Sequence, residues 1–305
     1  MSAIRKVIVL GATGDQGLPL LDRLIADGFE PTAGARRSDA LENTRFADLP
    51  VAHADIDDEE SLFAAFTGHD ALAMHLPFVF DRPKAEGFGR RIASAARRAG
   101  LAKIVFNTSC YVADHDLDLS AHDGRRDIER CIADSGAAYV VVRPVVFLDN
   151  IIRIWSKPSI VHHSVFAYPA ADTLKISWIC LEDVAAYMSA GLAQDGLTAD
   201  KVLVGGPEAL TGAELAERIS DAAGRTVRFQ SLTPDEFASN MSLLVTGSTE
   251  VKPHDIYSRM AEFYRWYNSQ PTSPLVVDLA PALAKLPVVP TSAADWAARQ
   301  DWTKV

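Results

Sequence analysis

The chain has 305 residues, of which 48% are hydrophobic and 23% are charged. This composition supplies enough apolar side chains for a folded core and excludes an intrinsically disordered chain. The formal net charge of −10 argues against general binding to nucleic acid or to an anionic membrane, because both partners are polyanions.

The start of the chain does not resemble a targeting segment, because the apolar run 7–10 is too short for a signal peptide or a membrane span. Three cysteines, Cys110, Cys131 and Cys180, lack C-x-x-C spacing, which suits reduced thiols better than disulfides or a zinc site. We therefore expect a cytoplasmic monomer or homodimer whose partner is a small-molecule substrate, with no metal, nucleic acid or membrane.

The first half of the chain alternates short apolar runs with helical patterns, which indicates a parallel sheet covered by helices on both faces. The predicted class is therefore α/β, a doubly wound parallel sheet of Rossmann type, with its ligand at the carboxyl ends of the strands. The predicted strands are Lys6–Leu10, 31–35, Val51–His53, 71–76, Lys103–Asn107 and 139–143. The predicted helices are 16–27, Glu59–Phe66, 84–99 and 125–134.

The pattern becomes irregular after Asn150, so we expect a Rossmann domain over 1–150 and a smaller C-terminal α/β substrate lobe over 151–305. This prediction allows some strands and helices of residues 151–305 to pack within the Rossmann domain. Thr211 and Glu214 form a capping-box pattern for a helix that ends at Gly224. The other predicted elements are strands 175–180, 201–204 and 226–229, and helices Leu181–Ala193, one capped by Thr233, and 255–268.

A glycine-rich turn follows the first predicted strand and precedes the first helix. Gly11, Gly14 and Gly17 form G-x-x-G-x-x-G in the context that a dinucleotide site requires. Such glycines tighten the turn and let the backbone approach a pyrophosphate at the helix N-terminus. A purely structural strand-to-helix turn is the alternative. The predicted cofactor-binding residues of the turn are Gly11, Thr13, Gly14, Asp15, Gln16 and Gly17.

The residues after the second and third predicted strands bear on which dinucleotide binds. Arg36 lies 19 residues beyond Gly17 and is followed by Arg37, which favours NADP(H) over NAD(H) because guanidinium groups bind a 2′-phosphate. A pair of solvated surface arginines is the alternative. Asp55 and Ile56 are candidates for contacts with adenine, although Asp55 and Asp57 equally suit helix capping. Further cofactor-binding candidates near predicted strand ends are Leu76, Asn107, Ser109 and Pro144.

Several segments together resemble the NmrA-like group of atypical short-chain dehydrogenase/reductases. The resemblance implies a Rossmann fold, a preference for NADP(H) and a substrate pocket between two lobes. The segments that carry it are V-L-G-A-T-G-x-x-G at 9–17, N-T-S at 107–109, I-E-R-C-I-A-D-S-G at 128–136, V-R-P-V-V-F-L-D-N at 142–150, W-I-C-L-E-D-V at 178–184 and G-G-P-E-A-L-T at 205–211.

The catalytic pair of typical short-chain dehydrogenases is missing. No Tyr-x-x-x-Lys occurs in the matching region, where Ala121 and Arg125 stand instead. An arginine does not titrate near neutral pH, so the usual tyrosine mechanism is not expected. The candidate proton donors are Tyr111 and His122. His115 and His122 are both predicted to lie on the loop after the fifth strand, and histidine is a natural proton donor near neutral pH. A packed aromatic ring and solvated loop histidines are the alternatives.

Three functions follow as hypotheses. The first is an NADPH-dependent reductase of a small unsaturated, quinone-like or aromatic acceptor, which Phe78, Phe80, Phe147 and Trp155 would orient. The second is a non-catalytic redox sensor that binds NADP(H). The third is an isomerase or epimerase, which the missing tyrosine disfavours. His162 and His163 are predicted to lie in a loop without a metal, and no G-x-S-x-G or H-E-x-x-H motif suggests a hydrolase.

Overall fold

The computed structural model describes residues 4–305, which form two compact units. Unit 1 contains the chain up to Pro144, together with Leu181–Val204 and Leu279–Val289. Unit 2 contains Val145–Cys180, Gly205–Asp278 and Pro290–Val305. The chain thus leaves the first unit at Pro144 rather than near Asn150, and two later segments return to it.

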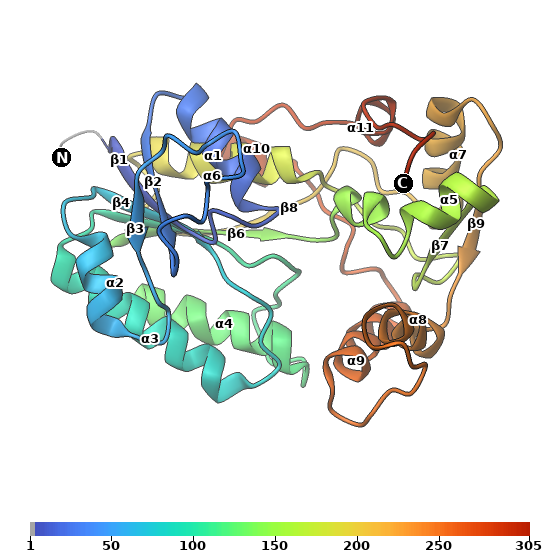
Figure 1. Cartoon of the computed structure of the whole chain (residues 1–305), viewed down its shortest axis with the longest axis horizontal. Helices are drawn as coiled ribbons and strands as arrows, with labels where there is room; N and C mark the ends of the chain where they lie inside the picture. The colour runs from blue at the N-terminus through green and yellow to red at the C-terminus, as the bar shows by residue number, and fades with distance from the viewer. Residues whose placement is uncertain (1–3) are drawn as a thin grey trace. The chain divides into compact units, whose positions relative to one another are not determined.

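Unit 1 is built on one sheet of seven strands, and every neighbouring pair in it is parallel (Figure 1). The strand order is β3-β2-β1-β4-β5-β6-β8. This order is that of a doubly wound Rossmann sheet with an additional strand, which confirms the predicted fold class. The strands are β1 (Lys6–Leu10), β2 (Glu30–Ala35), β3 (Val51–His53), β4 (Ala71–His75), β5 (Lys103–Asn107), β6 (Ala138–Pro144) and β8 (Ala199–Val204).

Helices cover both faces of this sheet (Figure 1). On one face α1 (Gly17–Ala26) packs against α6 (Leu181–Ala193), and α10 (Ala280–Lys285) contacts β8. The other face is covered by α2 (Glu59–Phe66), α3 (Arg82–Ala99) and α4 (Ser120–Ala133). The inner strands β1, β4, β5 and β6 are almost wholly buried between these layers, which explains their continuous apolar runs.

The strand order reverses between β1 and β4. These strands are direct neighbours, with Leu10 opposite Met74. The chain turns toward β2 after β1, whereas it turns toward β5 after β4. The loops after the two strands therefore diverge at the carboxyl edge, and such a point of reversal is where open α/β sheets bind ligands in a crevice.

Unit 2 contains a two-stranded parallel sheet of β7 (Val165–Tyr168) and β9 (Arg228–Ser231). Its rings form a connected cluster in which Phe166, Tyr168 and Trp178 are almost fully buried. Its helical elements are η1 (Leu148–Ile152), α5 (Lys157–His163), α7 (Gly212–Ala223), α8 (Pro234–Thr246), α9 (Ile256–Ser269) and α11 (Ala293–Ala298). The predicted caps are confirmed, because Thr211 and Thr233 each form a complete capping box.

Three local predictions are wrong. The segment 175–180 is not a strand, because its backbone pairs with three separate segments: Ile176 N–H bonds to Leu210, Ser177 N–H to Leu275 and Ile179 N–H to Val146. The predicted strand 226–229 is shifted to Arg228–Ser231. His162 and His163 lie in the last turn of α5 rather than in a loop.

A buried ion pair joins α4 to the neighbouring strands of unit 1. The Glu129 carboxylate is fully buried and accepts hydrogen bonds from Arg143 Nε at 2.8 Å and Nη2 at 2.6 Å. Lys201 Nζ lies 3.0 Å from the same carboxylate, and Arg143 also reaches the exposed Asp114 at 2.8 Å. The charges are therefore compensated where they are buried, which favours a structural role.

We expect Glu129→Ala to lower the free energy of unfolding by about 3–5 kcal/mol, because it leaves Arg143 buried without its anion. Asp114→Ala removes the other carboxylate partner of Arg143, an aspartate whose side chain is 83% exposed. It should lower the free energy of unfolding by less than about 1 kcal/mol. Urea unfolding followed by circular dichroism measures both. Equal losses in the two variants would contradict the assignment.

Candidate functional site

The glycine turn after β1 has a conformation that requires glycine at two of its three positions. Gly11 has φ +82°, in the left-handed region. A Cβ on Gly17 would lie only 2.2 Å from the Gly11 carbonyl oxygen. The turn is closed by the Gly14 N–H, which donates to the Gly11 carbonyl at 3.1 Å, and α1 begins directly at Gly17. The amides of the first turn of α1 therefore face the carboxyl edge of the sheet.

Three predicted site residues from two distant segments meet beside this turn. Gln16 Oε1 accepts hydrogen bonds from Asn107 Nδ2 at 2.8 Å and from Ser109 Oγ at 3.0 Å. The Ser109 N–H in turn donates to Asn107 Oδ1 at 2.8 Å. Ser109 has φ +63°, a conformation that non-glycine residues rarely adopt and that is found most often at functional sites. The end of β5 is thus tied to the N-terminus of α1.

The two arginines after β2 differ in their surroundings. Arg37 is exposed and its guanidinium forms two hydrogen bonds with Asp39, at 2.8 and 2.6 Å. This contact raises the Arg37 pKa and lowers the Asp39 pKa. Arg36 is also exposed, and no carboxylate in residues 4–305 lies within salt-bridge distance of it. Arg36 is therefore the guanidinium available for an anionic ligand at this edge.

The remaining predicted cofactor-binding residues occupy different environments. Asp55 and Ile56 are partly exposed after β3, and Asp55 Oδ1 accepts from the Asp57 N–H at 3.0 Å. Neither Asp55 nor Asp57 caps α2, because its N-cap is Asp58, whose carboxylate accepts from the Glu60 N–H. In the glycine turn Thr13 and Asp15 are exposed, whereas Leu76 and Pro144 are buried.

Arg125, in the first half of α4, is almost fully buried. Its Nη2 donates to the carbonyl oxygens of Leu76 at 2.7 Å and Pro77 at 2.9 Å. Its guanidinium carbon lies 4.9 Å from the centre of the Phe78 ring. No carboxylate in the described chain pairs with it, and burial lowers its pKa. Arg125 thus anchors the segment after β4 and places a buried positive charge there.

The titratable groups near Arg125 are held neutral. Burial, reinforced by the Arg125 charge, lowers the pKa of His75 to about 4 and that of His122 to about 3. Burial raises the pKa of Cys110 to about 12, so its thiol is not a nucleophile near neutral pH. His122 lies in the first turn of α4 and is buried, so the prediction that it lies on a loop is wrong.

Tyr111 and His115 follow Cys110 along the chain. Tyr111 is partly buried, and burial raises its pKa, so the phenol keeps its proton at neutral pH. His115 is exposed, as the loop prediction requires. Sequence reasoning missed His75, which ends β4 beside Gly11. The signal that was available is that a histidine ends an otherwise apolar strand, A-L-A-M-H.

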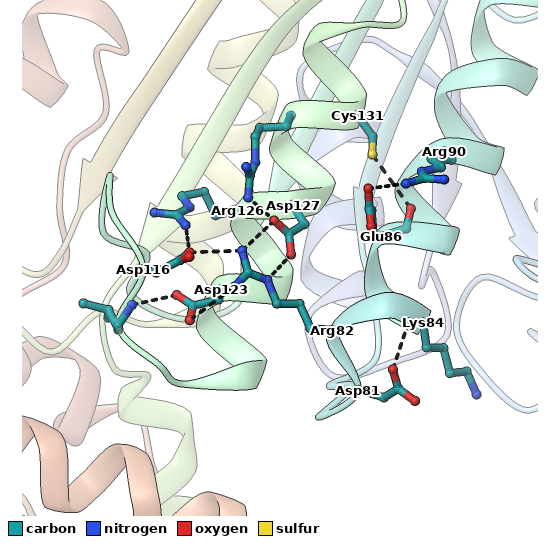
Figure 2. Close-up of polar contacts among 12 residues, drawn as sticks. Asp81, Arg82, Lys84, Glu86, Arg90, Asp116, Asp123, Arg126, Asp127 and Cys131 are labelled. Atoms are coloured by element: carbon teal, nitrogen blue, oxygen red, sulfur yellow. Dashed lines mark hydrogen bonds and ion pairs between the residues drawn. The ribbon is translucent and has the colours of Figure 1, made fainter.

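A second polar cluster lies between α3 and α4 (Figure 2). Arg82 lies among Asp116, Asp123 and Asp127, and it bonds to both oxygens of Asp127. A cavity of about 730 Å³ adjoins this cluster and Cys131. Its arginines are already paired with carboxylates or carbonyl oxygens, so the cluster is an internally compensated ion network rather than a second anion site.

Other kinds of site find no support in residues 4–305. No group of three or more His, Cys, Asp or Glu side chains there is placed to hold a metal ion. No helix in that part of the chain combines the length and apolar character needed to cross a bilayer.

The neutral histidines predict a pH-dependent stability. Below pH about 6.5 the unfolded chain protonates His75 and His122, whereas the native chain does not until pH falls to about 4 and about 3 respectively. The free energy of unfolding therefore falls as pH decreases, by up to about 1.4 kcal/mol per pH unit for each histidine. Urea unfolding at pH 7 and 5 measures this slope.

Two variants isolate the contribution of His122 to the dependence of stability on pH. His122→Phe should reduce the slope of stability against pH, whereas the exposed His115→Gln should leave it unchanged. The same slope in His122→Phe and in the unmodified chain would show that His122 titrates normally in the native state.

Comparison with known proteins places this site in a family. The NAD(P)H azoreductase of Xenophilus azovorans is 28% identical over 238 residues, which cover 77% of this chain and 80% of that protein. The (4-alkanoyl-5-oxo-2,5-dihydrofuran-3-yl)methyl phosphate reductase of Streptomyces griseus is 30% identical over 229 residues, covering 75% and 78%. The structure of the Escherichia coli NADPH-dependent quinone oxidoreductase complexed with NADPH aligns with a TM-score of 0.78 at 22% identity, over 96% of this chain and 98% of that one. The NmrA-like family model matches residues 4–297, and the chain therefore belongs to the NmrA-like family.

Proposed function

We propose that the chain is an NADPH-dependent reductase of a small unsaturated, quinone-like or aromatic acceptor. The observation that carries the proposal is the position of the glycine turn at the reversal of strand order, joined to Asn107 and Ser109 through Gln16. Among its relatives, the azoreductase and the (4-alkanoyl-5-oxo-2,5-dihydrofuran-3-yl)methyl phosphate reductase are named as reductases, and a third is named as a quinone oxidoreductase.

The residues at the carboxyl edge fit a dinucleotide. Gly14 carries no side chain where its backbone must approach a pyrophosphate, and the N-terminus of α1 favours negative charge. Gly11, Gly14 and Gln16 would hold the phosphate half, and Asn107 and Ser109 would border the nicotinamide half. NADPH supplies a hydride to an electron-poor acceptor, and the protein orients the two and excludes water.

Arg36 supports NADPH over NADH as the cofactor. It directly follows β2, where Rossmann proteins contact the adenosine ribose, and it has no competing carboxylate in residues 4–305. Arg37 is occupied by Asp39. One free guanidinium is sufficient to bind a 2′-phosphate through charge-assisted hydrogen bonds.

We expect Arg36→Ala to raise the Kd for NADPH by about tenfold to a hundredfold and to leave the Kd for NADH within about twofold, because NADH lacks the 2′-phosphate. Arg37→Ala should change the Kd for NADPH less than about threefold, since its side chain is already paired. Calorimetric titration gives all four constants. Equal losses for NADPH and NADH in Arg36→Ala would place Arg36 away from the 2′-phosphate.

Two aromatic rings after β4, one exposed and one partly buried, support an aromatic or conjugated acceptor. Phe78 and Phe80 follow β4 with their ring centres 6.2 Å apart, and Phe78 is 40% exposed. Arg125 lies under Phe78 and holds this segment in place. Flat rings of this kind stack on planar acceptors. In unit 2, Trp155 is exposed whereas Phe147 is buried.

The proton that completes the reduction has two candidate sources in this chain, besides water. Tyr111 keeps its phenol proton at neutral pH. His122 is neutral there, so it carries one transferable proton but no positive charge. Arg125 does not donate a proton, but its buried charge favours negative charge developing on an acceptor nearby. The overall reaction consumes NADPH, one proton and the acceptor and yields NADP+ and the reduced acceptor.

We expect the purified chain to oxidise NADPH when a quinone, an azo dye or an α,β-unsaturated lactone is added, and Phe78→Ala to raise the KM for that acceptor about threefold to tenfold. Tyr111→Phe should lower kcat if the phenol supplies the proton and leave kcat unchanged if water does. The loss of NADPH absorbance measures the rates. Tight NADPH binding with no turnover on the whole panel would refute the reductase proposal.

A redox sensor is the second candidate, favoured by the replacement of the catalytic pair by Ala121 and Arg125. A sensor must distinguish the two states of its ligand, because a ligand shifts an equilibrium only through differential affinity. Titration with NADP+ and with NADPH tests this directly. Equal affinities for the two forms would remove the sensor from consideration.

A further inference from the structure

His75 ends β4 and lies at the reversal of strand order. The neighbouring strand β1 ends at Leu10 and leads directly into the glycine turn, so the His75 side chain and the turn lie together at the carboxyl edge of the sheet. His75 belongs neither to the glycine motif nor to the pair of arginines after β2. Its surroundings nevertheless indicate a specific role toward the dinucleotide.

The imidazole ring of His75 packs flat against the glycine turn. A Cβ on Gly11 would lie 2.5 to 2.8 Å from three ring atoms, Cε1, Nδ1 and Nε2. A Cβ on Gly14 would lie 3.5 Å from Cε1 and 3.8 Å from Nε2. The Cε1–Nε2 edge therefore faces the space beside Gly14, where a backbone without a side chain lets a pyrophosphate approach. Gly11 is required by the ring as well as by its own positive φ.

The Nε2 atom of His75 is buried and has no hydrogen-bond partner in residues 4–305. Buried polar atoms in native proteins nearly always have a partner, so an exception at a ligand crevice points to the ligand as the partner. Because burial and the Arg125 charge keep the ring neutral, one of its nitrogens carries a proton and the other is an acceptor. A phosphate oxygen only accepts, so it selects the tautomer that is protonated at Nε2.

The charge around His75 also favours an anion. Arg125 is buried, and within the described chain its guanidinium bonds only to the carbonyl oxygens of Leu76 and Pro77. Buried charges are normally compensated, and the Arg125 charge, which acts on His75, has no carboxylate partner in the described chain. Since Leu76 directly follows His75, the same two hydrogen bonds also hold the strand end that carries the imidazole. Arg125 is thus a positioning residue for His75.

We propose that the Nε2–H group of His75 donates a hydrogen bond to the pyrophosphate bridge of the bound dinucleotide. The contact belongs to the phosphate half of the cofactor and does not depend on which acceptor is reduced. It rests on the dinucleotide binding that the proposed function includes, but not on turnover.

Binding of cofactor fragments to two substitutions of His75 tests the proposal. His75→Leu removes the donor and keeps most of the volume, whereas His75→Gln keeps an N–H group near the position of Nε2. We expect His75→Leu to raise the Kd for NADPH about tenfold and His75→Gln to raise it less than about threefold. The ligand 2′-phospho-ADP-ribose, which has the pyrophosphate but no nicotinamide, should show the same loss. The ligand 2′-AMP, which lacks the pyrophosphate, should show none.

His69 provides a matched control. It is a second partly buried histidine with a lowered pKa and an unpartnered ring nitrogen, but it precedes β4 and lies at the opposite edge of the sheet. His69→Gln should leave the affinity for all three ligands unchanged. A Kd for NADPH within twofold of the unmodified chain in His75→Leu would overturn the proposal. The proposal would also be overturned if His75→Leu lost affinity for NADPH but not for 2′-phospho-ADP-ribose, because the contact would then lie on the nicotinamide half.

Nitrogen NMR of the unmodified chain, labelled in its histidines, keeps the proposal testable if His75→Leu does not fold. The His75 Nε2 resonance, assigned by its loss in His75→Gln, should move when 2′-phospho-ADP-ribose is added. An unmoved resonance at saturation would also overturn the proposal. If the contact is found and no acceptor is reduced, the reductase proposal fails alone. If acceptors are reduced and His75→Leu binds NADPH normally, the His75 proposal fails alone.

Discussion

The reversal of strand order between β1 and β4 is the constraint on which the site depends. It makes the chain diverge at one edge of the sheet and brings together residues that are far apart in sequence. Gln16 lies next to Asn107 and Ser109, which follow it by more than ninety positions, and Gly11 lies against His75. The glycine turn is a local motif, but it becomes part of a site only because β4 and β5 end beside it.

The buried charges of unit 1 fall into two kinds. Glu129 is enclosed with two cations, Arg143 and Lys201, so its charge is satisfied within the protein. The Arg125 guanidinium is surrounded by carbonyl oxygens and an aromatic ring. These dipoles solvate its positive charge, but no carboxylate in the described chain neutralises it. The first arrangement stabilises the fold, whereas the second favours an anion. This difference in compensation distinguishes the paired charge of Glu129 from the unpaired charge of Arg125, for which we propose a functional role, in the same helix, α4.

The same charge explains what replaces the tyrosine and lysine of typical relatives. A lysine at the position of Arg125 would present a mobile ammonium group that lowers the pKa of a neighbouring phenol. Arg125 is instead held by the chain after β4, and the nearby groups are kept neutral by burial. In the reductase that we propose, such a site would orient the cofactor and bias charge, and it would leave acid–base chemistry to Tyr111, His122 or water.

Local signals in the sequence determined the parts of the protein that depend on few neighbours. Apolar runs predicted the strands of the parallel sheet, glycine spacing predicted the turn before α1, and Thr211 and Thr233 predicted their helix caps. Only the tertiary structure decided the rest, because the partners are remote in sequence. The segment 175–180 is not a strand because three separate segments pair with it, and His75 became a site residue because β4 lies beside β1. Whether a charge is balanced, as for Glu129, or unbalanced, as for Arg125, depends on which side chains the fold buries beside it, and no local pattern encodes that.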